Sequence, residues 1–178
     1  SNYIFKNRSG RPLRFFLRIL SVCAMILPVT ILEGCVFFMA MQYKSEQIVS
    51  DYNGALQRAV TTLNNMGANV ELIAHPIMTG EGKSINITTD IYEKIENCSV
   101  FLADTTEANP NVMYELGIAY NKKKPIIMVR EKGKHIKVPS DIISEYYYSF
   151  DGMTELENLF VKHIRTIMEK DYGIVYPG

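Results

Sequence analysis

Hydrophobic residues along this chain follow two alternating patterns. Short apolar runs rich in strand-forming residues predict five strands, at residues 35–41, 70–74, 99–104, 125–129 and 146–150. Apolar residues spaced three and four apart predict helices at 45–66, from about 88 to 96, from about 111 onward and at 153–170. Strands that alternate with helices favour a mainly parallel sheet. The pattern therefore predicts an α/β fold, a flavodoxin-like or Rossmann-like three-layer sandwich of about five strands.

Residues 1–34 lie outside this alternation, and we separate them from the domain predicted at residues 35–172. The basic residues of the segment are Lys6, Arg8, Arg11, Arg14 and Arg18. An apolar run at 19–32 follows them, but a spanning helix needs ~20 apolar residues and Pro28 interrupts this run. We expect the segment to pack on the domain or at an interface. Membrane contact through residues 11–32 is the alternative, and we do not favour it.

Composition narrows the classes of partner. The 178 residues suit one domain, and 19 basic and 19 acidic residues give a formal net charge of zero. Without a basic surface that alternates with aromatic residues, we expect a small-molecule partner and no nucleic acid. The three cysteines and three histidines match no metal pattern, so we expect neither a metal nor a cofactor. Reduced core thiols favour a cytoplasmic protein, with a membrane-proximal location as the alternative.

Polar side chains gather where the strand predicted at 99–104 ends. Asp104 closes that strand, Asn109 and Asn111 precede the next helix, and Glu115 lies about one turn into it. In open parallel sheets this edge faces the ligand, so Glu115 is a candidate functional carboxylate. On this local pattern alone, an ordinary solvated helix residue is an interpretation of about equal weight.

Four segments carry a family resemblance. They are Cys35-Val-Phe-Phe-Met-Ala-Met-Gln-Tyr43, Ile95-Glu-Asn-Cys-Ser-Val-Phe-Leu-Ala-Asp-Thr-Thr106, Asn109-Pro-Asn-Val-Met-Tyr-Glu-Leu-Gly117 and Lys124-Pro-Ile-Ile127. Together, over roughly residues 35–170, they resemble the nucleoside 2-deoxyribosyltransferase-like family, a relative of TIR-type domains. In that family the Glu of Glu-Leu-Gly attacks the sugar C1′ and displaces the base. The resemblance implies this nucleophilic role for Glu115.

The same resemblance implies the substrate contacts. Asn109 stands six positions before Glu115, where the family has an acidic residue that helps to hold the sugar or the nucleophile. Asp90, at the start of the preceding helix, is the best match for an acidic residue that touches the base. The turn after the first strand contributes Met41, Gln42 and Tyr43, where the family usually has small residues and a proline.

The remaining candidates each have a plain structural alternative. Tyr43 and Tyr114 can stack on a base or simply pack. Asn111 is a candidate ligand residue, although its position favours the role of helix N-cap. Asp104 can contact the ligand, or it can cap its own loop by holding Thr105 or Thr106.

Glycosidic chemistry suits these residue types. Breaking an N-glycosidic bond builds positive charge on the sugar, which a carboxylate such as Glu115 can stabilise or trap covalently. Asp90 or Asp104 could give a proton to the departing base if its pKa is raised.

We therefore expect an enzyme that cleaves or transfers at the N-glycosidic bond of a nucleoside, a nucleotide or an NAD-like dinucleotide. One alternative is a TIR-like domain that senses a nucleotide or consumes NAD in a stress or antiviral response. Another is a catalytically silent nucleotide-binding module. The family resemblance also implies a homo-oligomer.

Overall fold

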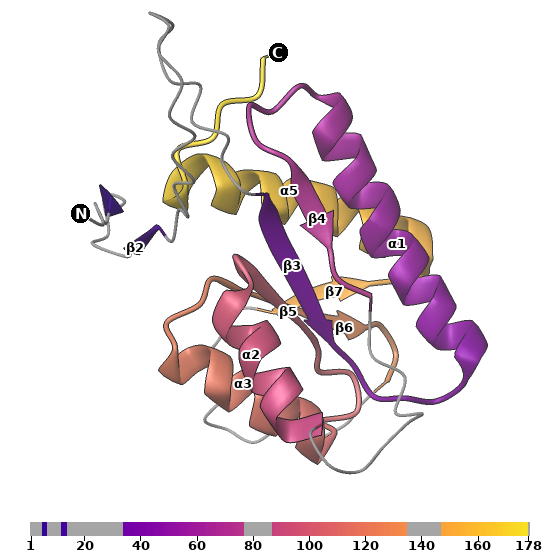
Figure 1. Ribbon diagram of the computed structural model, residues 1–178. Helices are drawn as coiled ribbons and strands as arrows, with labels where there is room; N and C mark the ends of the chain where they lie inside the picture. The colour runs from indigo at the N-terminus through magenta and orange to yellow at the C-terminus, as the bar shows by residue number, and fades with distance from the viewer. Residues whose placement is uncertain (1–4, 7–11, 14–33, 77–86, 135–146, 178) are drawn as a thin grey trace, which may run out of the picture.

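The computed structural model describes residues 5–6, 12–13, 34–76, 87–134 and 147–177 (Figure 1). Its strands are β1 (Phe5–Lys6), β2 (Pro12–Leu13), β3 (Cys35–Ala40), β4 (Leu72–Ala74), β5 (Val100–Asp104), β6 (Ile126–Glu131) and β7 (Tyr147–Phe150). Its helices are α1 (Glu46–Asn65), α2 (Ile87–Asn97), α3 (Pro110–Asn121) and α5 (Met153–Asp171). Strands β1 and β2 pair antiparallel as a separate two-stranded sheet.

The other five strands form one parallel sheet in the order β4-β3-β5-β6-β7. Helices pack on both faces of this sheet, so the predicted α/β sandwich with a five-stranded parallel sheet is confirmed. Figure 1 shows α2 and α3 together on one side of the sheet, with α1 and α5 on the other.

Alternating side chains divide the core between these two faces. Residues Phe37, Met39, Val100, Leu102, Ile127, Val129 and Phe150 pack toward α1 and α5. Residues Phe38, Ala40, Phe101, Ala103 and Met128 pack toward α2 and α3. Both faces are apolar because helices cover both, which explains why the strands read as continuous hydrophobic runs.

The strand order reverses direction between β3 and β5. Strand β4 lies on one side of β3, and β5 lies on the other. The loops that leave the carboxyl ends of β3 and β5 therefore run in opposite directions. Such a switch point is where open parallel sheets bind ligands. The chain places the turn after β3, residues 41–45, and the loop after β5, residues 105–109, at this edge.

Several predicted boundaries were wrong by one or two residues. Strand β4 begins at Leu72 rather than at residue 70, β7 begins at Tyr147, and β6 runs on through Arg130 and Glu131. The extension of β6 follows from its pairing with β7, where Arg130 lies opposite Ser149.

The amino-terminal segment is described only at β1 and β2, so the expectations for its apolar run and for Cys23 lie outside the described residues. Within the described part of the chain, no helix is both long enough and apolar enough to cross a bilayer.

Candidate functional site

Helix α3 positions Glu115 beside the switch point. Asn109 caps the helix, and Val112, Leu116 and Ala119 pack it onto the sheet in the α2/α3 core. Glu115 lies at the flank of this apolar stripe and is half-buried. Its carboxylate makes no hydrogen bond or ion pair with the residues that the structure describes. Burial raises the pKa of Glu115 from 4.5 to about 7, because an ionised carboxylate loses hydration there.

The loop before α3 supplies the N-cap of that helix. The side-chain oxygen of Asn109 accepts hydrogen bonds from the backbone N–H groups of Asn111, at 2.9 Å, and Val112, at 3.4 Å. The N-cap is therefore Asn109, and the preference for Asn111 in that role was wrong. Asn111 itself is exposed. Ala108 has a φ of 47°, a left-handed conformation that is strained for a residue with a Cβ and that recurs at functional loops.

Asp104 faces the opposite side of the sheet from Glu115. Its Oδ2 accepts a hydrogen bond from Tyr52 Oη of α1 at 3.1 Å, and its Oδ1 accepts from Thr106 N at 2.9 Å and from Thr106 Oγ1. Burial and the Asp104 carboxylate raise the pKa of Tyr52, so the phenol stays protonated as the donor. Both oxygens of Asp104 are thus used inside the protein, in the loop-cap arrangement considered for Thr106.

The turn after β3 reaches the same edge. Met41 and Gln42 are half-buried, and Tyr43 is 48% exposed. The next residue, Lys44, forms an ion pair of 2.5 Å with Glu107. This pair joins the turn after β3 to the loop after β5 across the switch point. The sequence pattern did not single out Lys44 or Glu107, because their proximity follows only from the strand order.

Two further candidates lie on the helices of the Glu115 face. Asp90, in the first turn of α2, forms an ion pair with Lys94 at 3.0 Å. Tyr114 projects away from the sheet and is 60% exposed, so it does not pack in the core. The substrate contacts stay predictions for Asp90, Asp104, Asn109, Asn111, Met41, Gln42, Tyr43 and Tyr114.

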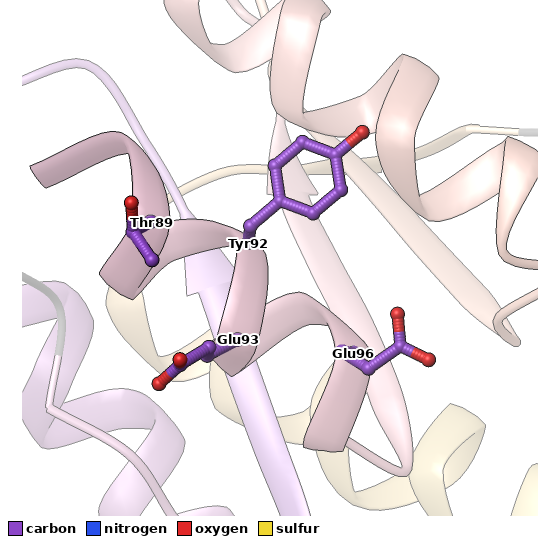
Figure 2. Close-up of a pocket in the computed structure, with 4 residues that line it drawn as sticks. All are labelled: Thr89, Tyr92, Glu93 and Glu96. Atoms are coloured by element: carbon purple, nitrogen blue, oxygen red, sulfur yellow. The ribbon is translucent and has the colours of Figure 1, made fainter.

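A shallow pocket lies elsewhere, on the outer side of α2. Its lining residues are Thr89, Tyr92, Glu93 and Glu96, and Figure 2 shows all four projecting from this one helix. Glu96 forms an ion pair with Lys122, whose Nζ lies 5.9 Å from the centre of the Tyr92 ring. None of the candidate site residues lines this pocket. A hollow built on one exposed helix supplies no arrangement for catalysis, so Glu115 remains the centre of the candidate site.

Metal chemistry finds no support in the described residues. No group of three His, Cys, Asp or Glu side chains among them is arranged to hold an ion. Cys35 and Cys98 are free thiols, and burial raises the pKa of both.

Comparison with known proteins finds only weak likeness, to solved structures. No family model matches the chain, and no curated protein matches it. Among solved structures, a similar one is the CMP N-glycosidase BcmB from Clostridium botulinum, which is 15% identical. The match covers 70% of this chain and 95% of that chain, with a TM-score of 0.47. Similarity at this level assigns no function, which must therefore come from the residues themselves.

Proposed function

We propose that this protein breaks the N-glycosidic bond of a nucleoside, a nucleotide or an NAD-like dinucleotide, by hydrolysis or by transfer, with Glu115 as the nucleophile. The observation that carries the proposal is a half-buried carboxylate, unpaired among the described residues, beside the switch point of a parallel sheet. Ligands bind at that position in folds of this kind.

Desolvation suits Glu115 to this reaction. Cleavage of the bond leaves positive charge on the sugar, and a carboxylate shielded from water attracts that charge more strongly than a hydrated one. A lysine or arginine paired with Glu115 would cancel the effect. With a pKa of about 7, Glu115 is ionised in about half of the molecules at neutral pH.

The described residues offer no obvious proton donor to the departing base. Asp104 uses both oxygens within the protein, and Asp90 is paired with Lys94. A base that is already cationic, such as the pyridinium of an NAD-like dinucleotide, leaves as a neutral molecule and needs no proton. This arrangement favours such a substrate, or one whose base is protonated by water.

The test compares wild-type protein with Glu115→Gln on deoxynucleosides, nucleoside monophosphates and NAD, with and without an acceptor base. Free base is followed by chromatography. We expect release by wild type and a loss of at least ~1,000-fold in Glu115→Gln, because the nucleophile is removed. Glu93→Gln, an exposed glutamate of α2, is the matched control and should retain activity. Equal release by wild type and Glu115→Gln would contradict the proposal.

The pH dependence separates a nucleophile from a proton donor. An attacking carboxylate must be ionised, so kcat/KM should rise with pH through about 7 and then level off. If Glu115 instead protonated the base, kcat/KM would fall over the same interval. Wild-type rates measured from pH 5 to 9 on the responding substrate distinguish the two roles.

A catalytically silent nucleotide-binding module is the second candidate. The commitment of Asp90 and Asp104 to internal partners favours it, because neither carboxylate is then in place to assist a leaving base. This module would bind a nucleotide and release no base from any substrate. The TIR-like alternative shares the need for Glu115 and would release base from NAD alone.

A further inference from the structure

A second charged side chain lies on the Glu115 face of the sheet. On β6, Met128 packs toward α2 and α3 while Val129 packs toward α1 and α5, so the alternation places Arg130 on the α2/α3 face. On β7, Phe150 packs on the opposite face, which places Tyr147 beside Arg130. The guanidinium carbon of Arg130 lies 4.3 Å from the centre of the Tyr147 ring.

Among the described residues, Arg130 has no polar partner. Its Nε is buried and makes no hydrogen bond, and none of the described residues forms an ion pair with it. A buried donor without an acceptor is costly, and in native proteins it calls for a specific explanation. The stacked ring of Tyr147 attracts the positive charge but accepts no hydrogen bond in the guanidinium plane.

The two carboxylates nearest to Arg130 along the strands have other partners. Glu131, the next residue of β6, faces the other side of the sheet and accepts a hydrogen bond from Lys134 Nζ at 2.6 Å. Asp104 is held by Tyr52 and Thr106. The guanidinium of Arg130 is therefore left without an anionic partner among the described residues.

Strand register sets the position of Arg130 relative to the candidate site. Asp104, the last residue of β5, lies opposite Val129. Arg130 is thus one residue beyond the end of β5, level with the loop that leads to α3 and Glu115. It lies at the carboxyl edge of the sheet, one strand, or about 5 Å, away from β5.

We propose that Arg130 binds a phosphate group of the substrate, so that the protein acts on a nucleotide or dinucleotide rather than on a free nucleoside. This inference rests on the proposed function. The planar guanidinium fork matches two phosphate oxygens, and contact with the Tyr147 ring restricts the guanidinium before the ligand arrives. Phosphate binding at β6 and attack from α3 would engage opposite ends of one nucleotide sugar.

The test measures binding by calorimetry to full-length Glu115→Gln, which blocks turnover. The probes are NAD, four nucleoside 5′-monophosphates, the four matched nucleosides and inorganic phosphate. We expect the preferred monophosphate to bind roughly 10- to 100-fold more tightly than its nucleoside, as hydrogen bonds to a charged group imply. Adding Arg130→Gln should remove this affinity gap between the monophosphate and its nucleoside, and it should leave the affinity for the nucleoside unchanged. Arg130→Lys should restore part of it.

Matched variants separate a phosphate site from a structural role. Arg165→Gln removes another arginine that stacks on a tyrosine, Tyr176, on the far face of the sheet, and should preserve the gap. Tyr147→Phe keeps the ring and should preserve the gap, whereas Tyr147→Leu should narrow it. Inorganic phosphate should compete with the monophosphate only while Arg130 is present.

Different results would contradict the phosphate site and the glycosidic reaction. If Arg130→Gln weakens monophosphate and nucleoside equally, or weakens neither, Arg130 binds no phosphate, even if the wild type releases base. If the Arg130-dependent gap is present but no base is released, the phosphate site stands and the glycosidic reaction is wrong. Absence of binding to every phosphate probe overturns the inference.

Discussion

At the residue scale, the burial of Glu115 makes the stability of the fold depend on pH. The folded protein raises its pKa from 4.5 to about 7, so folding favours the protonated carboxyl. This contribution is fully present below pH 4.5 and is lost as the pH rises through 7. A difference of this size corresponds to roughly 3 kcal/mol between the two protonation states. A carboxylate kept out of water therefore lowers the stability of the fold where it is ionised.

Replacing this carboxylate by a neutral amide should stabilise the protein at high pH. We expect Glu115→Gln to raise the free energy of unfolding by ~1–3 kcal/mol at pH 8, because the desolvated charge is gone. At pH 4.5 the difference should nearly vanish. Urea unfolding at the two pH values measures this. Glu93→Gln, at an exposed glutamate, should show no such dependence, and a pH-independent effect of Glu115→Gln would contradict the explanation.

At the element scale, the carboxyl ends of three neighbouring strands are tied together. Asp104 at the end of β5 holds Tyr52 of α1, and Thr106 Oγ1 accepts a hydrogen bond from the backbone N–H of Glu131 at 2.9 Å. The Lys44–Glu107 pair adds the turn after β3. These contacts hold the carboxyl edge of the sheet in place on the side that faces α1. Glu115 takes no part in them.

Loss of the Tyr52 hydroxyl should therefore affect stability more than chemistry. Tyr52→Phe leaves Asp104 Oδ2 buried without its donor, and we expect it to lower the free energy of unfolding by about 1–2 kcal/mol. Base release by the folded variant should keep the wild-type pH profile, because Glu115 lies on the other face. Urea unfolding and rates from pH 5 to 9 check both parts. A shifted pH profile would show that the network reaches Glu115.

The same elements show how far the sequence predicts the site. Apolar runs predicted the sheet strands because helices bury both faces, and Glu115 was placed correctly on the helix after β5. Asp104 ends the strand as the sequence predicts, but its side chain faces α1 and not α3, since one residue of register decides which face of a strand a side chain takes. Arg130 lies just beyond the strand predicted at 125–129, because hydropathy gives no sign of the pairing between β6 and β7 that extends the strand.

At the scale of the whole molecule, one sheet holds two cores together. Phe160 of α5 is fully buried in the α1/α5 core, far from the helix that carries Glu115. We expect Phe160→Ala to reduce the free energy of unfolding by about 3–5 kcal/mol, because the lost ring leaves a cavity. Thermal unfolding measured by circular dichroism should remain a single transition.

A matched surface change controls for this effect. Val175→Ala alters a side chain that is 72% exposed and should stay within about 0.5 kcal/mol of wild type. Two separate transitions in Phe160→Ala would show that the faces of the sheet unfold independently.

The sheet ends on both sides in short strands. Strand β4 has three residues and β7 has four, so each edge offers few unpaired backbone groups to another chain. Long exposed edges invite neighbouring molecules to extend the sheet, and short ones discourage it. If copies of this chain assemble as the family resemblance implies, we expect them to meet through helix and loop side chains, with each sheet remaining complete within its own subunit.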